Sequence, residues 1–261
     1  MVAGTVSSFH MSDSRDVRTF ASELKFVLEP AVAIQVRQWA RTHLDPDPHG
    51  AGPDGDEYLT TSLYFDTEHF HVFQRRGSFG RSKYRIRRYG EADAAFLERK
   101  LREPTILAKR RTLIPLAGLD QLDRAPAEGW SGGWFQARVS ARRLRPVCQV
   151  SYRRTARLLA TGSELVRLTL DDALVAQPTS VIRFRDGHGV PVLAERQILE
   201  LKFRHHIPAV FKRLVEEFAL TPAPASKYRL SMAALGEARL AAPPALKMAA
   251  PMAAGGTTVH V

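Results

Sequence analysis

The sequence predicts an α+β protein built on an antiparallel β-sheet or barrel with flanking helices. Strand-like runs follow one another at short spacing with few helices between them, which favours antiparallel pairing over a doubly wound parallel sheet. Several runs alternate charged with apolar residues, as strands with two unlike faces do. The clearest helical periodicity lies outside this series of strands, at residues 29–44 and beyond residue 208.

The expected elements follow one another along a single domain. We predict strands at 21–28, 58–67, 82–89, 94–101, 109–116, 147–160, 165–176 and 196–203, with 181–185 pairing across the turn at 186–189. We predict helices from Pro30 to 44, at 68–76, at 208–220 and at 226–235. Residues 45–57 read as a loop, and 118–146 as a helical or irregular excursion. We expect the domain to span 17–240, between a flexible N-terminus at 1–16 and a disordered tail at 241–261.

The charge balance points to a polyanionic partner. The 261-residue chain carries 38 Lys and Arg against 27 Asp and Glu, a formal net charge of +11. Such an excess suits nucleic acid, an anionic membrane surface or a phosphate-rich small molecule. Composition alone does not choose among them.

The compartment is predicted from what the sequence lacks. A single cysteine, Cys148, excludes an internal disulfide framework and a cysteine-based metal site, and its strand-like context predicts a buried small hydrophobe. No apolar run approaches the roughly 18–20 residues that span a bilayer. The first 16 residues do not resemble a signal peptide, so we expect a soluble, cytoplasmic protein.

Three strands each place a glutamate two residues before a lysine. Side chains at i and i+2 of a strand point to the same face, so each pair shares a face opposite apolar neighbours. An exposed, salt-bridged face and a charged interior are both compatible with this pattern. The pairs are Glu23 with Lys25, Glu98 with Lys100, and Glu200 with Lys202.

Arginine dominates several of the other strands. "KYRIRRY" places Lys83, Arg85 and Arg87 on one face, and Arg154, Arg167 and the pair Lys109 and Arg111 occupy further strands. A solvated face would account for any one strand. Several converging guanidinium groups instead favour an anion between them, as in a barrel whose basic face is turned inward around a chain of phosphates. The glutamates would then hold Mg²⁺ or Mn²⁺, which prefer hard oxygen ligands.

Eight short motifs in order carry a family resemblance. "SELKF", "SLYFDT", "KYRIRRYG", "FLERK", "SYRRTA", "VRLTLDDAL", "LELKF" and "SKYRL" resemble the vacuolar transporter chaperone (VTC) domain over residues 20 to 236. That domain belongs to the triphosphate tunnel metalloenzymes, a CYTH-like superfamily that includes relatives of adenylate cyclase and thiamine triphosphatase. The resemblance implies an antiparallel β-barrel tunnel, the triphosphate tunnel fold, in which the best-known members make inorganic polyphosphate from ATP.

The resemblance also assigns residues. Those that match the family's basic tunnel positions are Lys25, Arg85, Arg87, Lys100, Lys109, Arg154 and Arg167. Those expected to contact substrate are Lys83, Lys202, Ser226 and Lys227. Glu200 matches the metal-binding glutamate, and Glu23 and Glu98 are the further candidate ligands of Mn²⁺ or Mg²⁺. Pro224 departs from the pattern, because a basic residue often precedes the "SK" pair there.

Three functions remain open on the sequence. The leading hypothesis is a metal-dependent polyphosphate polymerase that transfers the terminal phosphoryl group of ATP to a growing chain. A hydrolase of tripolyphosphate or nucleoside triphosphates would use the same tunnel with water as acceptor, and a non-catalytic polyphosphate-binding module would use it for binding alone. Nucleic acid is disfavoured because the basic residues alternate within strands. The eukaryotic enzymes suggest a membrane-protein partner, of which the sequence carries no direct sign.

Overall fold

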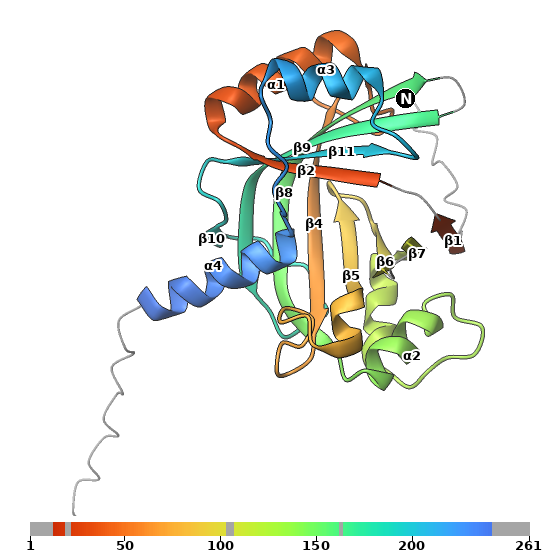
Figure 1. Cartoon of the computed structure of the whole chain (residues 1–261). Helices are drawn as coiled ribbons and strands as arrows, with labels where there is room; N and C mark the ends of the chain where they lie inside the picture. The colour runs from red at the N-terminus through yellow and green to blue at the C-terminus, as the bar shows by residue number, and fades with distance from the viewer. Residues whose placement is uncertain (1–12, 19–21, 103–106, 162–163, 242–261) are drawn as a thin grey trace, which may run out of the picture.

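The computed structural model describes residues 13–18, 22–102, 107–161 and 164–241. Its strands form one antiparallel sheet with the order β1-β7-β6-β5-β4-β8-β9-β11-β2, and two short strands, β3 and β10, pair with β8 and β9 (Figure 1). The strands are β1 (Asp13–Arg18), β2 (Ser22–Leu28), β3 (Asp45–Pro46), β4 (Glu57–Asp66), β5 (Ser82–Tyr89), β6 (Ala94–Arg102), β7 (Leu107–Pro115), β8 (Arg145–Thr161), β9 (Glu164–Pro178), β10 (Val190–Pro191) and β11 (Gln197–Phe203).

Helices flank this sheet, so the predicted α+β class is confirmed. They are α1 (Pro30–His43), the 3₁₀ helices η1 (Gly77–Arg81) and η2 (Leu116–Asp123), α2 (Gly133–Ala141), α3 (Ala209–Glu217) and α4 (Lys227–Ala241). None of the helices in the described ranges is long and apolar enough to cross a membrane.

The sheet curls until strands that are distant in its order face each other. β2 and β11 cross over the upper ends of β4 and β5 (Figure 1). The Lys100 ammonium on β6 donates to Glu23 Oε2 on β2 at 3.1 Å, although five strands separate β6 from β2 in the sheet order. In the described part of the chain no backbone pairing joins the edge strands β1 and β2. The Lys100–Glu23 ion pair therefore links β6 to the edge strand β2 across the open side of the sheet.

The apolar face of the curled sheet is its outer face, where helices cover it. Phe26, Leu168 and Leu199 are at most 1% exposed and pack with α1 and α3 into one core cluster. A second core cluster joins β4, β5 and β8 to α2 and α4. Because neighbouring residues of a strand face opposite ways, burying these apolar residues outward turns Lys25, Glu200 and their neighbours inward.

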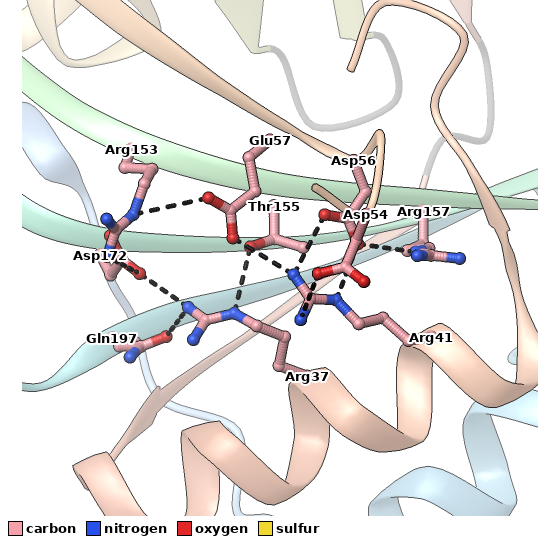
Figure 2. A network of polar contacts seen from close by, with 10 residues as sticks. All are labelled: Arg37, Arg41, Asp54, Asp56, Glu57, Arg153, Thr155, Arg157, Asp172 and Gln197. Atoms are coloured by element: carbon pink, nitrogen blue, oxygen red, sulfur yellow. Dashed lines mark hydrogen bonds and ion pairs between the residues drawn. The ribbon is translucent and has the colours of Figure 1, made fainter. Parts of the chain in front are cut away.

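A network of arginines and carboxylates fixes α1 to the outer face (Figure 2). Arg37 donates to Asp172 Oδ2 at 2.6 Å and to Gln197 Oε1 at 2.9 Å. One turn later, Arg41 donates to Asp56 at 3.1 and 3.2 Å. Arg157 reaches the same carboxylate at 2.9 Å, so the fully buried Asp56 is shared by two guanidinium groups. The helix is held by directional bonds as well as by apolar packing.

Most of the predicted elements are confirmed within one or two residues, but 68–76 is a series of turns and not a helix. The Asp66 carboxylate organises this loop by accepting hydrogen bonds from the backbone amides of Thr67, Val72 and Phe73. Phe70 and Arg75 have φ values of 56° and 57°, which interrupt a right-handed helix. A single buried carboxylate outside the segment thus overrides its helical periodicity.

The predicted strand at 181–185 is also wrong. The Gln149 side chain accepts from the Arg185 amide at 2.9 Å and donates to the Arg185 carbonyl at 2.7 Å. A side-chain amide therefore takes both hydrogen bonds that a neighbouring strand would otherwise provide. The strand that pairs with β9 in this region is the short β10.

Two further differences concern the margins of the domain. Residues 13–16, expected within a flexible N-terminus, belong to β1, which pairs with β7. The expected loop 45–57 contains the short strand β3, which pairs with β8. Residues 1–12 and the predicted tail from 242 onward lie outside the described residues.

Replacing Asp56 with alanine should destabilise the protein by roughly 3–5 kcal/mol, because it leaves the guanidinium groups of Arg41 and Arg157 without their shared carboxylate. Urea unfolding measures the change. Asp54→Ala is the matched control: its side chain is 47% exposed and pairs with Arg41 at 2.9 Å, so its loss should cost about 1 kcal/mol or less. Equal effects of the two substitutions would contradict the role of Asp56 in holding Arg41 of α1 and Arg157 of β8 together.

Candidate functional site: a basic concave face

The predicted site residues all lie on the concave face of the curled sheet or at the start of α4. Strand register places them in rows: Lys83, Lys100 and Lys109 are aligned across β5, β6 and β7. Arg85, Glu98 and Arg111 form the next row. On the opposite wall, Glu200 lies across from Lys25 of β2. The charged interior, rather than an exposed salt-bridged face, therefore explains the Glu–Lys strands.

Glu200 is the meeting point of three ammonium groups. Its Oε1 accepts from Lys25 at 2.6 Å and from Lys227 at 3.0 Å, and its Oε2 lies 3.4 Å from Lys202. The side chain is 7% exposed. Burial would raise the pKa of Glu200, but the surrounding ammonium groups, led by Lys227, hold it well below its ordinary value. Glu200 is therefore a carboxylate at any physiological pH.

Glu23 continues this line of ion pairs toward β6. Its two oxygens contact Lys25 at 2.6 Å and Lys100 at 3.1 Å. Burial and the neighbouring Glu200 act to raise the pKa of Glu23, but Lys25, Lys100 and Lys202 lower it to about 2. Since Lys25 contacts both glutamates, their carboxylates lie on either side of one ammonium group.

Asp171 anchors the same line from β9 and was not among the predicted site residues. The Arg154 guanidinium binds it with two parallel hydrogen bonds, Nε to Oδ1 at 2.6 Å and Nη2 to Oδ2 at 2.8 Å. Lys227 makes a further ion pair with it. Burial would raise the pKa of Asp171, and Arg154 and Lys227 lower it. This fully buried carboxylate fixes two of the proposed phosphate-binding cations.

Glu98 gathers a separate group of cations on the opposite wall. Its Oε2 accepts from Arg85 Nε at 2.6 Å, and its Oε1 lies 3.3 Å from Lys109 and 3.1 Å from Arg111. Burial would raise the pKa of Glu98, but these cations and Arg87 hold it well below its ordinary value. Glu98 therefore contacts a different set of cations from Glu23 and Glu200.

Several cations of this face are hydrogen-bonded to neutral groups. Arg87 donates to Ser62 Oγ at 3.0 Å, and Lys83 donates to Ser226 Oγ at 2.8 Å. Burial and the nearby Lys100 and Lys25 lower the pKa of Lys83 to about 8. Burial also lowers the pKa of Lys202 to about 8, against the opposing effect of Glu200. The positive charge of this face therefore exceeds what its own carboxylates neutralise.

Three buried hydroxyls on the surrounding strands have no hydrogen-bond partner within the described ranges. They are Tyr152 Oη, Thr60 Oγ1 and Thr169 Oγ1, all from residues at most 1% exposed. Tyr152 lies among the cations, with the Lys227 ammonium 5.1 Å and the Arg154 guanidinium 5.3 Å from its ring centre. An unpaired buried hydroxyl is costly, and an anion between these strands would give it an acceptor.

The carboxylates fit a hard divalent cation only in part. Across the described residues, no three His, Cys, Asp or Glu side chains lie close enough together to hold a metal ion. Glu23 and Glu200, which share Lys25, could provide two carboxylate ligands. Mg²⁺ characteristically takes one or two carboxylates and completes its shell with water and substrate phosphates. The donor set is thus compatible with a metal that arrives together with a phosphate ligand.

The fold and the site define an antiparallel-sheet protein whose curled sheet encloses a basic, ion-paired face. A family model described as "VTC domain" matches residues 20–236. The chain therefore belongs to the VTC-domain family, which confirms the resemblance drawn from the eight motifs. No curated protein is significantly similar to this chain in sequence.

Solved structures resemble this chain at low sequence identity. A candidate adenylate cyclase from Bacillus halodurans is 14% identical with a TM-score of 0.48, over 81% of this chain and 95% of that one. A Hippeastrum protein described as a candidate adenylyl cyclase with a dominant triphosphatase activity is 14% identical with a TM-score of 0.47, over 82% and 95%. A Pyrococcus horikoshii protein is 14% identical with a TM-score of 0.45, over 84% and 99%.

The affinity of this face for inorganic tripolyphosphate should fall as pH rises from 7.5 to 9.5. Lys83 and Lys202 have pKa values of about 8, so both are largely charged below pH 8 and lose their protons above it. A bound anion favours the ammonium form, so binding at pH 8.5 should take up protons. Calorimetry in two buffers of different ionisation enthalpy measures this uptake.

The matched variant is Lys202→Met, which should reduce the proton uptake while leaving the fold intact. Lys212→Met is the control, because Lys212 is exposed on α3, away from the concave face. Affinity that is independent of pH across this range would contradict the assignment of Lys83 and Lys202 to the anion site.

Proposed function

We propose that this protein is a polyphosphate polymerase, which transfers the terminal phosphoryl group of ATP to a growing inorganic polyphosphate chain with Mn²⁺ or Mg²⁺. The observation that carries the proposal is the excess of lysines and arginines over carboxylates on one concave face, in a chain that belongs to the VTC-domain family. Arginine forks and ammonium groups from both walls match phosphate oxygens, and a chain of phosphates would neutralise them at several points at once.

The proposed roles follow from the contacts. Arg85, Arg87 and Arg154 would hold phosphate oxygens, since each guanidinium is oriented by a partner on the sheet. The remaining tunnel cations, which would track the phosphate chain along the face, are Lys25, Lys83, Lys100, Lys109, Arg167, Lys202 and Lys227. Ser226 orients Lys83 through its hydroxyl. Catalysis by this set is positioning of donor and acceptor plus stabilisation of the charge that develops on the transferred group.

The metal belongs with Glu200 and Glu23 in this proposal. When bound, it would supply positive charge to the phosphate oxygens of the nucleotide. Glu98 is assigned instead to orient Arg85 and Arg111, because its contacts are with cations of its own wall, whereas Glu200 and Glu23 lie on either side of Lys25. The sequence predicts a cytoplasmic location. The family resemblance suggests a membrane-protein partner that accepts the product.

Incubation with ATP and Mn²⁺ or Mg²⁺, followed by product analysis, tests the proposal. Polyphosphate together with ADP is the expected result. Orthophosphate with ADP, or with shorter phosphates from tripolyphosphate, would identify a hydrolase that uses water as acceptor in the same site. Tight tripolyphosphate binding without turnover would identify a binding module.

Arg87→Ala should abolish most of the activity while leaving the fold intact. The loss of a charge-assisted phosphate contact costs about 1.5–3 kcal/mol, which corresponds to roughly 10- to 150-fold in turnover over KM. Arg88→Ala is the control, since Arg88 lies on the opposite face of the same strand and donates to the Ala92 carbonyl. An unchanged rate in folded Arg87→Ala protein would contradict the assignment of β5 to the phosphate-binding site.

Glu200→Gln separates a metal ligand from an ion-pair partner. If Glu200 holds the metal, turnover should collapse, and metal-free tripolyphosphate binding should persist or tighten because Lys25, Lys202 and Lys227 lose their shared anion. If Glu200 only neutralises these lysines, thermal stability should fall and the Mn²⁺ dependence of the rate should stay the same. Glu217→Gln, on α3, controls for the substitution itself.

A further inference from the structure

A group of aromatic rings occupies one end of the concave face and takes no part in the phosphate contacts proposed above. Tyr89, the last residue of β5, makes edge contacts with Tyr58 at 5.6 Å and with Phe96 at 5.8 Å between ring centres. All three rings are partly exposed. They come from three adjacent strands, β4, β5 and β6, and so form a continuous platform.

Arginines hold this platform in place. The Arg111 guanidinium lies 3.3 Å from the centre of the Phe96 ring and donates to Tyr89 Oη at 3.2 Å. Arg87 lies 5.9 Å from the centre of the Tyr89 ring, and Arg167 donates to Tyr58 Oη at 2.7 Å. Flat rings and a guanidinium plane at fixed positions are the groups on which nucleic-acid bases stack.

The order of residues along β5 gives the platform a direction. Its inward positions are Tyr89, Arg87, Arg85 and Lys83, spaced about 6.6 Å apart. At the Lys83 end, Lys100 and Lys109 continue the same row and no aromatic side chain interrupts it. One end of the face is therefore lined by aromatic rings among arginines, and the other by lysines, of which Lys100 and Lys109 pair with glutamates. This arrangement suits a ligand with a base at one end and phosphates along the rest.

We propose that Tyr58, Tyr89 and Phe96 form a nucleobase platform, which seats the base of the nucleoside triphosphate so that its phosphates lie along Arg87 and Arg85 toward Lys83. This inference rests on the proposed function and adds to it the end at which the nucleotide enters. The lysine-lined end is then the one through which an inorganic chain extends. Because stacking tolerates any base, the platform distinguishes a nucleotide from bare polyphosphate but does not select one base.

Binding of three probes to the whole protein tests the platform: ATP, ribose 5-triphosphate and inorganic tripolyphosphate. Phe96→Leu keeps the apolar volume and removes the ring, and Tyr89→Leu does the same at the neighbouring position. Either change should weaken ATP binding by about 10-fold. The affinities for ribose 5-triphosphate and tripolyphosphate, which have no base, should change by less than about 2-fold. Phe79→Ala is the control, because Phe79 also lies under an arginine, Arg142 at 4.3 Å, but on η1 away from the platform.

The outcomes separate the platform from the proposed function. A preference of the wild type for ATP over ribose 5-triphosphate that disappears in both leucine variants supports the platform. Equal weakening of all three probes would show that the rings only pack the wall, and would overturn it while the phosphate site stands. Failure of the wild type to bind any of the three would overturn the proposed function and the platform with it. Thermal unfolding of each variant shows whether it is folded.

Discussion

A line of alternating charges across the concave face is the interaction on which the rest of the structure depends. It runs from Arg154 through Asp171, Lys227, Glu200, Lys25 and Glu23 to Lys100. The line crosses the neighbouring strands β8, β9, β11 and β2, and it joins them to α4 and to β6, which backbone pairing does not bring beside them. The line thus links the edge strand β2 to β6 across the interior of the open sheet.

The line also explains how so much positive charge can be buried. Taking an ion out of water costs several kcal/mol even after the protein relaxes, and attraction to a partner offsets this only when the geometry is good. Asp171 meets that condition with its two-point contact to Arg154. Lys83 and Arg87, whose partners here are hydroxyls, do not. A face that is only partly neutralised by its own carboxylates is poised for an external anion, which is the physical reason for assigning it to phosphate.

Much of this arrangement could be predicted from the sequence, because it depends on alternation within strands. The apolar residues between Glu23 and Lys25 or between Glu200 and Lys202 determine which face is buried outward, and the charges must then turn inward. The predicted strands that contribute site residues are all present. Alternation puts Asp171 on the same face as Arg167, four residues earlier, but a lone aspartate carries no motif that identifies it as a site residue until Arg154 and Lys227 are seen beside it.

The two segments whose structure was predicted wrongly, 68–76 and 181–185, are both shaped by contacts with residues distant in sequence. The turns at 68–76 follow from Asp66 and from the Tyr228 hydroxyl that donates to it at 2.5 Å, 162 positions away along the chain. The segment 181–185 is held by Gln149, whose side chain takes the place of a strand. Local periodicity has no access to such contacts, so it fails where one buried polar side chain decides the path of the backbone.

The two faces of the β8–β9 pair are coupled by a repeated contact. Arg154 binds Asp171 on the inner face, and the preceding Arg153 binds Asp172 on the outer face, again with two bonds, at 3.0 and 3.2 Å. Asp172 in turn accepts from Arg37 of α1 (Figure 2). Consecutive Arg–Asp pairs on opposite faces fix the register of these strands from both sides, next to the irregularity between Ser151 and Arg153. The contacts of Asp172 with Arg153 and Arg37 on the outer face thus act together with the Arg154–Asp171 contact on the inner face. Together they keep Arg154 in a single position before any ligand binds.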